Sequence, residues 1–459
     1  MSAAASSFAT PDGVTAALCD FARRLRWEEV PEEAREVARH CLLDFLGCAL
    51  AGAQEPLCRI AREALVAGEG SREAGLLGRP ERASLLTAAL VNGAAGHALD
   101  FDDTHTAMNG HPSVPVWPAL LALAERRAPS GRALLEAFVA GVELECRLGA
   151  LLGGRHYAAG FHATGTLGSF GAAAACAHLL GLDRPAWLHA LGLAGTQAAG
   201  LKSGFGSMAK PLHAGRAASA GLLAALLAAG GFTAQRAVIE EAQGFAATHA
   251  GGEPEPAALE RLAGRFLVRD TLFKFHAACY LTHAAIQAAL ELRERARLDP
   301  ARIEGVELRV SPTLRGVCDI PAPRTGLEGK FSLRATAAMA LLGIDTADPA
   351  SFDDSTMAAP ALIALRDRVR VVPVEALPPT RAQVVVELRG ERLEAAADTG
   401  LPAPDLRLQR ERLLRKFRAL ALPVLGAPRS ARLAELALGA DELATSSPLL
   451  EACSTSATA

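Results

Sequence analysis

The sequence predicts a mainly α-helical protein, in which both ends of the chain form one large all-helical domain and a smaller α+β domain is inserted between them. Apolar residues recur at the three-to-four spacing of a helix through residues 1–267 and again through 401–459. Alternating, strand-like patterns occur only within residues 268–400. The helices after 400 are therefore expected to return to the first domain.

In the first part, Val14 to Ala67 reads as amphipathic helix, with Pro31 and Glu32 marking one start. Arg72 to Ser84 is predicted to be a connector, and residues 231–268 are predicted to form amphipathic helices. The helices between them are expected at Leu85–Ala95, Val116–Ala124, Ala133–Leu152, Phe170–Leu180, Ala186–Ala199 and Ala217–Ala229.

The α+β part is expected to open with a helix that begins near Lys274 and runs to about Arg297. A further helix, Arg334–Leu342, separates its strands. Strands are predicted at Glu304–Ser311, Val369–Val374 and Arg381–Ala397, the last as a hairpin turning at Arg389-Gly390. Only the tail, Ser454–Ala459, is expected to be disordered.

Composition narrows the class of protein. The 459 residues are 50% apolar and carry a net charge of −3, which argues against nucleic acid or an anionic membrane as a partner. Met1–Thr10 lacks the features of a signal peptide, and the apolar run Ala217–Gly230 is too short to cross a bilayer. The nine cysteines are scattered without a Cys-x-x-Cys pair, as in a reduced, cytoplasmic protein.

One polar stretch stands out between two predicted helices. His97 to His105, with Gly110 to Ser113 close behind it, holds three carboxylates and three imidazoles. Ionisable groups at this density are costly to bury, so the stretch either faces water or lines a site.

Two glycine-rich segments have the same context. Gly153–Gly168 and Gly200–Arg216 each precede an apolar helix, and the second lacks the Walker A spacing. Thr164 and Thr166 are expected to cap the helix behind them, and the start of that helix is a candidate carboxylate site. The recurrence favours one shared pocket over unrelated loops.

Lysine is rare in this chain. Only five of the 47 basic residues are lysines, and Tyr157 and Tyr280 are the two tyrosines. In a chain so rich in arginine, a position that carries lysine is one where arginine is not expected to fulfil the same role. Ammonium is compact, and its pKa responds to burial. Lys210 and Lys274 both fall in the polar segments.

Five motifs stand out in these segments: Asp100-Phe-Asp-Asp-Thr104, His111-Pro-Ser, Gly160-Phe-His162-x-Thr-Gly-Thr, Met208-x-Lys210-x-x-His213-x-Gly215, and Lys274 with Cys279-x-x-x-His283. With them the chain resembles the MmgE/PrpD family, whose activities include dehydration of 2-methylcitrate, decarboxylation of cis-aconitate and epimerisation of iminodisuccinate. The resemblance covers nearly the whole chain, and it implies a helical domain with an α+β lid, a homodimer, a small polycarboxylate substrate and no metal or other cofactor.

Carried over motif by motif, the resemblance implies an active site at Asp100, Thr104, His111, His162, Lys210 and Lys274. The imidazoles of His111 and His162 are the acid/base candidates, because neutral imidazole moves protons near pH 7. Lys210 and Lys274, with Arg216, are expected to hold substrate carboxylates, and Asp100 to orient an imidazole or a lysine. Thr104 and Thr164 are expected to contact the substrate. The remaining acids and histidines are expected to be supporting or structural: Asp102, Asp103, His97, His105, His156, His213 and His283.

The leading hypothesis is a hydro-lyase that dehydrates a hydroxylated di- or tricarboxylate such as 2-methylcitrate. The alternatives are an epimerase or isomerase of the iminodisuccinate type and a cis-aconitate-type decarboxylase. One departure bears on the choice: dehydratases and decarboxylases of the family usually carry tyrosine where this lid has Ala335, and the epimerase branch can carry alanine. Two alternatives come from other classes of protein. One is a metal-dependent hydrolase that uses Asp100, Asp102, Asp103 and His111, and the other is a non-enzymatic helical scaffold.

Overall fold

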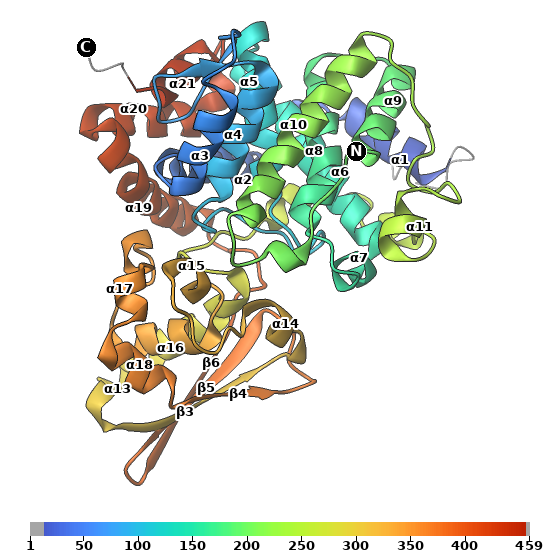
Figure 1. The fold of residues 1–459 in the computed structure, drawn as a ribbon. Helices are drawn as coiled ribbons and strands as arrows, with labels where there is room; N and C mark the ends of the chain where they lie inside the picture. The colour runs from blue at the N-terminus through green and yellow to red at the C-terminus, as the bar shows by residue number, and fades with distance from the viewer. Residues whose placement is uncertain (1–12, 456–459) are drawn as a thin grey trace.

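The computed structural model describes residues 13–455. Met1–Thr10 lies outside this range, as does the predicted disordered tail except for Ser454 and Thr455. Figure 1 shows a large helical part with a smaller α+β part below it, joined where the chain crosses between them. The predicted class, mainly α with a small α+β part, is confirmed.

The helical part opens with α1 (Val14–Arg24), α2 (Glu32–Gly52), α3 (Pro56–Leu65), α4 (Leu85–His97), α5 (Ser113–Arg127), α6 (Gly131–Leu152), α7 (Gly154–Ala158), α8 (Ala163–Leu179), α9 (Arg184–Gly195) and α10 (Ala209–Ala229). It is built around α10, which packs against α8 and α4, while α6 packs on the far side of α8.

Small residues bring the backbones of these helices together. A Cβ added to Gly215 of α10 would lie 2.1 Å from the carbonyl oxygen of Leu90 on α4. A Cβ added to Gly221 would lie 2.6 Å from the amide nitrogen of Ala173 on α8. Any larger residue at either position would push the helices apart, so the alanine- and glycine-rich sequence fixes how closely the segments that precede α8 and α10 approach each other.

Helix α10 is long and apolar enough to cross a membrane, and so is the pair α2–α3 if its 80° bend is counted as a break within one span. The apolar run predicted near Ala217 is the later part of this helix, which begins eight residues earlier at Ala209. Its most apolar window is 61% buried against protein, as in the core helix of a globular domain.

The prediction of amphipathic helices through residues 231–268 is wrong. Residues 231–268 form mostly loop, with only α11 (Phe245–Ala250) and α12 (Ala257–Arg261) as short α-helices, because Gly244, Gly251 and Pro254 interrupt the amphipathic pattern. The predicted connector Arg72–Ser84 contains a short antiparallel ribbon of β1 (Ala74–Gly75) and β2 (Arg82–Ala83).

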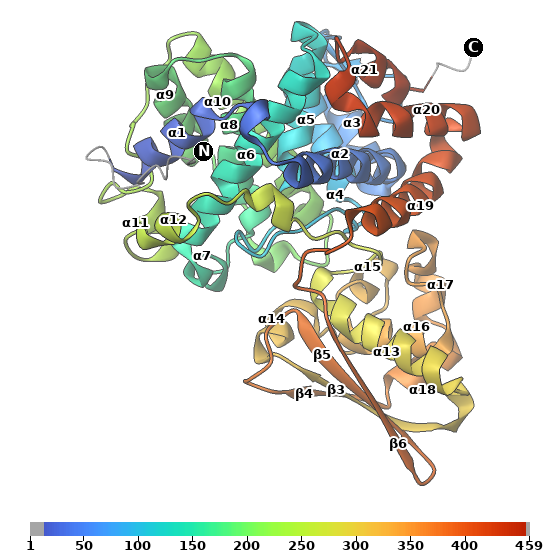
Figure 2. The same cartoon turned by 180° about the vertical axis from the view of Figure 1, so that it is seen from behind.

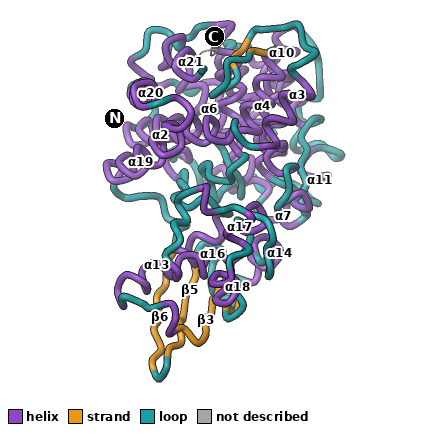
Figure 3. Tube along the Cα trace, turned by 60° about the vertical axis from the view of Figure 1, so that its left-hand side comes forward, coloured by secondary structure: helices purple, strands orange, loops and turns teal. Residues whose placement is uncertain are grey.

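The α+β part contains a four-stranded sheet in the order β4-β3-β5-β6. Strand β3 (Ile303–Val310) is parallel to β4 (Val369–Pro373) and antiparallel to β5 (Arg381–Leu388), which forms the predicted hairpin with β6 (Glu391–Asp398). Helices α13 (His283–Ala296) and α16 (Leu333–Leu342) pack against the sheet and each other, with α14 (Arg315–Cys318), α15 (Gly326–Gly329), α17 (Asp354–Met357) and α18 (Pro360–Arg366) around them. Figure 3 shows these strands at one end of the molecule.

The opening helix of this part starts later than predicted, since α13 begins at His283 and Lys274 lies in a non-helical segment before it. After β6 the chain returns to the helical part as α19 (Leu406–Leu425), α20 (Ala427–Leu438) and α21 (Ser447–Cys453). Figure 2 shows α19 lying along α2, at the edge that faces the α+β part. The seam between the two parts is therefore formed by the segments 98–112, 271–282 and α19.

Candidate active site

The polar stretch between α4 and α5 lies on this seam. Leu99 and Phe101 are buried in the hydrophobic core of the α+β part, although they follow a helix of the other part. Asp100, between them, adopts a left-handed backbone conformation with φ 50° and is buried. A residue other than glycine is held in this conformation only when its surroundings determine it, and such residues cluster at functional sites.

The Asp100 carboxylate joins three separate segments. Its Oδ1 lies 2.6 Å from Nζ of Lys274 and 2.8 Å from Nζ of Lys210, and 3.9 Å from Nε2 of His111. Burial alone would raise the pKa of Asp100, but the two ammonium groups outweigh it and hold the pKa well below its usual range. Asp100 is therefore ionised and binds both lysines at once.

A second carboxylate fixes two imidazoles. Asp102 accepts from Nδ1 of His97 at 2.8 Å, and Nδ1 of His111 lies 3.2 Å from its other oxygen and 2.7 Å from the carbonyl of Asp103. Because these neighbours only accept, both rings carry their proton on Nδ1 and leave Nε2 as the basic nitrogen. Burial lowers the pKa of His97 to about 4, and it also lowers that of His111, so both rings are neutral at pH 7.

His162 completes the cluster from the start of α8. Its ring stacks on His97 with centroids 5.7 Å apart, and its Nδ1 lies 3.1 Å from Nδ1 of His213. Burial holds the pKa of His162 well below its usual value. Within residues 13–455, Nε2 of His97, Nε2 of His162 and Oδ2 of Asp100 are buried without a hydrogen-bond partner. Unpaired buried polar atoms are rare in proteins, and three in one cluster are typical of a site built for a polar ligand.

The structure brings together five of the predicted residues, namely Asp100, His111, His162, Lys210 and Lys274. The two threonines that were predicted to contact the substrate form hydrogen bonds with the protein backbone instead. The hydroxyl of Thr104 donates to the carbonyl of Gly110, and Oγ1 of Thr164 accepts from the amide of His111. Both bonds shape the loop that carries His111.

The two threonines predicted to cap α8 do not cap it. The N-cap residue is His162, and Thr164 and Thr166 already lie within the first turn. Thr166 contacts the ring of His156, with Oγ1 2.7 Å from Nε2.

Arg216 does not join the cluster. It lies on the exposed side of α10 and lines a separate surface cavity of ≈ 330 Å³ together with His213. The interpretation of Arg216 as a substrate clamp is therefore not supported by its position. Lys210 and Lys274 likewise bind the protein's own carboxylate in this structure, so a substrate carboxylate would have to share them with Asp100.

Two more lysines reach the same loop and were not predicted. Lys330 donates to the carbonyl of Leu99 at 2.7 Å, and Lys416 donates to that of Phe101 at 2.6 Å. Lys274 donates to the carbonyl of Asp100, which lies between those two residues, at 2.8 Å. The rarity of lysine was the available signal, because four of the five lysines gather here.

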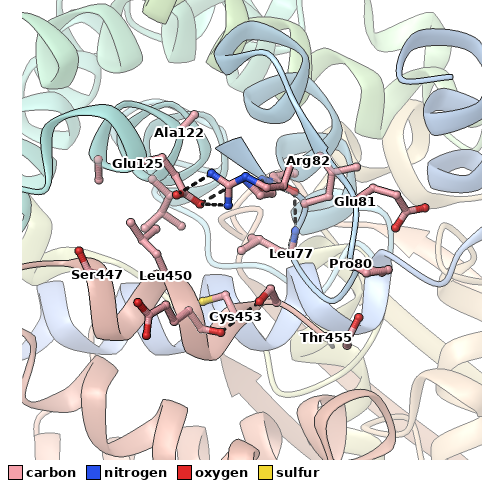
Figure 4. A pocket seen from close by; sticks show the side chains of 17 residues that line it. Leu77, Pro80, Glu81, Arg82, Ala122, Glu125, Ser447, Leu450, Cys453 and Thr455 are labelled. Carbon is pink, nitrogen blue, oxygen red and sulfur yellow. Dashed lines mark hydrogen bonds and ion pairs between the residues drawn. The ribbon is translucent and has the colours of Figure 1, made fainter. Parts of the chain in front are cut away.

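The site is closed to solvent. Asp100 is 3% exposed, His111 8% and Lys274 0%. Neighbouring cavities reach its edges: one of ≈ 560 Å³ is lined by Phe101 and Lys416, beside Asp100. A separate cavity of ≈ 310 Å³ lies between the β1–β2 ribbon and α21, where the guanidinium of Arg82 pairs with Glu125 (Figure 4). A substrate would have to displace part of the surrounding protein to reach these buried groups of the site.

Four residues of the cluster, His97, Asp100, Asp102 and His111, are close enough together to hold a metal ion. The electrostatics oppose a cation there. Asp100 is already matched by Lys210 and Lys274, and the only other ionised carboxylate of the four, Asp102, is engaged by two imidazoles. A divalent ion would face two ammonium groups within a few ångströms of its ligands.

We therefore expect the activity to survive exhaustive dialysis against a chelator with less than a twofold loss. Metal analysis of the dialysed protein is the accompanying measurement. Stoichiometric zinc or manganese that leaves together with the activity, and restores it on readdition, would show that the cluster is a metal centre.

Comparison with known proteins covers almost the whole chain. Residues 16–257 match the model of the MmgE/PrpD N-terminal domain, and residues 276–442 match that of the MmgE/PrpD C-terminal domain. The cis-aconitate decarboxylase of Aspergillus terreus is 29% identical over 96% of this chain and 95% of its own length. The human enzyme of the same name is 32% identical over 84% of this chain and 83% of its own, and the mouse enzyme is 30% identical.

Proposed function

The chain belongs to the MmgE/PrpD family of enzymes, and from that premise we propose that it decarboxylates an unsaturated tricarboxylate of the cis-aconitate type. The similarity to fungal and mammalian cis-aconitate decarboxylases along nearly the full chain supports this choice over the dehydration of 2-methylcitrate that the sequence first suggested. The observation that carries the proposal is the position of Nε2 of His111, 3.9 Å from the Asp100 carboxylate that binds the ammonium groups of Lys210 and Lys274.

The reaction requires one proton. When the bond between the carbon skeleton and one carboxylate breaks, carbon dioxide leaves and its bonding electron pair stays on the skeleton. That pair moves through the carbon–carbon double bond to a neighbouring carbon, which must be protonated. Stabilising the developing charge and supplying this proton are therefore the two tasks of the protein.

The cluster contains groups suited to both tasks. Lys210 and Lys274 supply two positive charges for the remaining carboxylates and for negative charge that develops on the skeleton. His111 binds a proton at Nε2 and delivers it to carbon, while its Nδ1–H stays bonded to the carbonyl of Asp103. Exclusion of water strengthens each of these interactions.

A second candidate rests on Ala335. This residue is fully buried on α16 and offers no hydroxyl where the family's dehydratases and decarboxylases usually carry tyrosine. Proton removal and return at a carbon next to a carboxylate, as in an epimerase, needs the same imidazoles and lysines but no such hydroxyl. Ala335 therefore favours epimerisation of an amino- or iminodicarboxylate as the alternative.

The test is a panel of cis-aconitate, 2-methylcitrate and an iminodisuccinate precursor, each incubated with the enzyme in deuterium oxide. Decarboxylation releases carbon dioxide and leaves one deuterium on the product. Dehydration creates an alkene without carbon dioxide, and epimerisation exchanges the α-hydrogen without net loss of any group. Turnover of 2-methylcitrate or exchange of the dicarboxylate, with cis-aconitate left untouched, would overturn the decarboxylase assignment.

A further inference from the structure

The carbonyls of three consecutive residues around Asp100 are each held by a different lysine. Lys330 binds the carbonyl of Leu99, Lys274 that of Asp100, and Lys416 that of Phe101. Their Nζ–O distances are 2.7, 2.8 and 2.6 Å. Charge-assisted hydrogen bonds are stronger than neutral ones, so this segment is fixed more firmly than its place in a loop would suggest.

The three lysines come from three regions of the chain. Lys274 lies in the non-helical segment that crosses the seam, and Lys416 belongs to α19 of the helical part, where it also pairs with Asp44 at 2.7 Å. Lys330 alone belongs to the body of the α+β part, between α15 and α16. Its own carbonyl accepts from the amide of Cys279 at 2.9 Å, which ties it to the start of that part.

The segment needs this support because of its backbone. Asp100 has φ 50°, which is unfavourable for any residue with a Cβ. In that conformation its carboxylate meets Lys210 and Lys274 while Leu99 and Phe101 enter the core of the α+β part. Rotation of the peptide that Lys330 holds would change the φ of Asp100 directly, because the carbonyl of Leu99 belongs to the peptide that precedes Asp100.

We propose that Lys330 is a positioning residue, which holds Asp100 in its left-handed conformation through the carbonyl of Leu99 so that docking of the α+β part completes the active site. This role does not depend on which reaction of the family the enzyme catalyses. It explains why an ammonium group is buried at the seam facing the cluster rather than exposed to water.

The charge of Lys330 responds to its surroundings. Burial, together with Lys274 and Lys210 across the seam, lowers the pKa of Lys330 to about 8, while Asp100 and Glu55 oppose that shift. The ring of Phe352 also faces its ammonium, 5.9 Å away. Lys330 is therefore charged at pH 7 and loses its proton, and the charge assistance to its bond, as the pH rises through about 8.

The test compares Lys330→Met with Lys202→Met. Lys202 is a matched control because its Nζ also donates to a backbone carbonyl, that of Tyr157 at 3.0 Å, away from the Asp100 segment. We expect Lys330→Met to lower kcat by roughly 10–100-fold with a smaller change in KM, since a small misplacement of reacting groups costs about this much. The decline of wild-type kcat above pH 8 should be absent from the variant, and Lys202→Met should keep both the rate and the profile.

A second readout does not depend on knowing the substrate. Hydrogen–deuterium exchange of residues 97–105 should accelerate in Lys330→Met and stay unchanged in Lys202→Met. If Lys330→Met does not fold, Lys330→Gln, which keeps a donor without a charge, takes its place in both measurements. Unchanged exchange in this segment, kcat within twofold of wild type, or an alkaline decline that persists in the variant would each overturn the proposal.

Discussion

Replacement of Asp100 by asparagine is expected to abolish most activity, with kcat/KM lower by about 10³-fold, and to reduce the free energy of unfolding by about 3–5 kcal/mol, the usual cost of removing one partner from a buried ion pair. The carboxylate is the only counter-charge within 3 Å of both Nζ of Lys210 and Nζ of Lys274 in the described chain. Without it, two buried ammonium groups repel each other across the site.

The pH dependence of this loss has a definite sign. The pKa of Asp100 is held well below the unfolded value of 3.8, so its contribution to stability is fully present above that value. It disappears only as the pH falls through the lowered pKa of the folded state. The difference in unfolding free energy between wild type and Asp100→Asn should therefore be constant from pH 5 to 7 and shrink under acid conditions, as chemical denaturation at several pH values would reveal.

A double variant separates charge balance from chemistry. Asp100→Asn combined with Lys274→Met removes one positive charge along with the negative one, so it should recover a large part of the lost stability. It should not recover activity, because the remaining ammonium group is no longer positioned. Recovery of kcat in the double variant would mean that Asp100 acts only by neutralising charge.

The helices that surround the site were predictable because their apolar faces repeat with the helical period over long stretches. Their ends were not, and one error had consequences. Placing the start of α10 near Ala217 rather than at Ala209 left Lys210 and Arg216 in a loop, where either could reach a substrate. At 3.6 residues per turn, six residues rotate Arg216 by about 120° from Lys210, onto the exposed side of the helix.

The sequence predicts which residue types gather at the site better than it predicts the contacts between them. The excess of arginine over lysine drew attention to Lys210 and Lys274, and the same reasoning applied to Lys330 and Lys416 would have drawn attention to the other two lysines of the cluster. That three of them bind consecutive carbonyls depends on how α19 and the α+β part pack around residues 99–101. Such a register is set by tertiary packing and leaves no local pattern in the sequence.

His111→Asn is expected to lower kcat by about 10²–10⁴-fold, the contribution typical of a positioned proton donor, with little change in KM or melting temperature. The asparagine amide can replace Nδ1 in donating to the carbonyl of Asp103, so the loop keeps its hydrogen bond while Nε2 is lost. His105→Asn is the matched control. His105 lies in the same loop, but its Nε2 bonds to the carbonyl of Leu267, so its loss should lower stability and leave kcat nearly intact.

The pH profile shows which way the proton moves at Nε2. Because burial, Lys274 and Lys210 lower the pKa of His111 below 6.5 against the opposing effect of Asp102, its protonated form is scarce at pH 7 and becomes more abundant as the pH falls. If Nε2 donates the proton that replaces carbon dioxide, kcat/KM should rise as the pH is lowered from 8 towards 6, and the rise should be missing in His111→Asn. If kcat/KM instead falls with pH, Nε2 works as a base, and proton abstraction, as in dehydration or epimerisation, becomes the better account of this site.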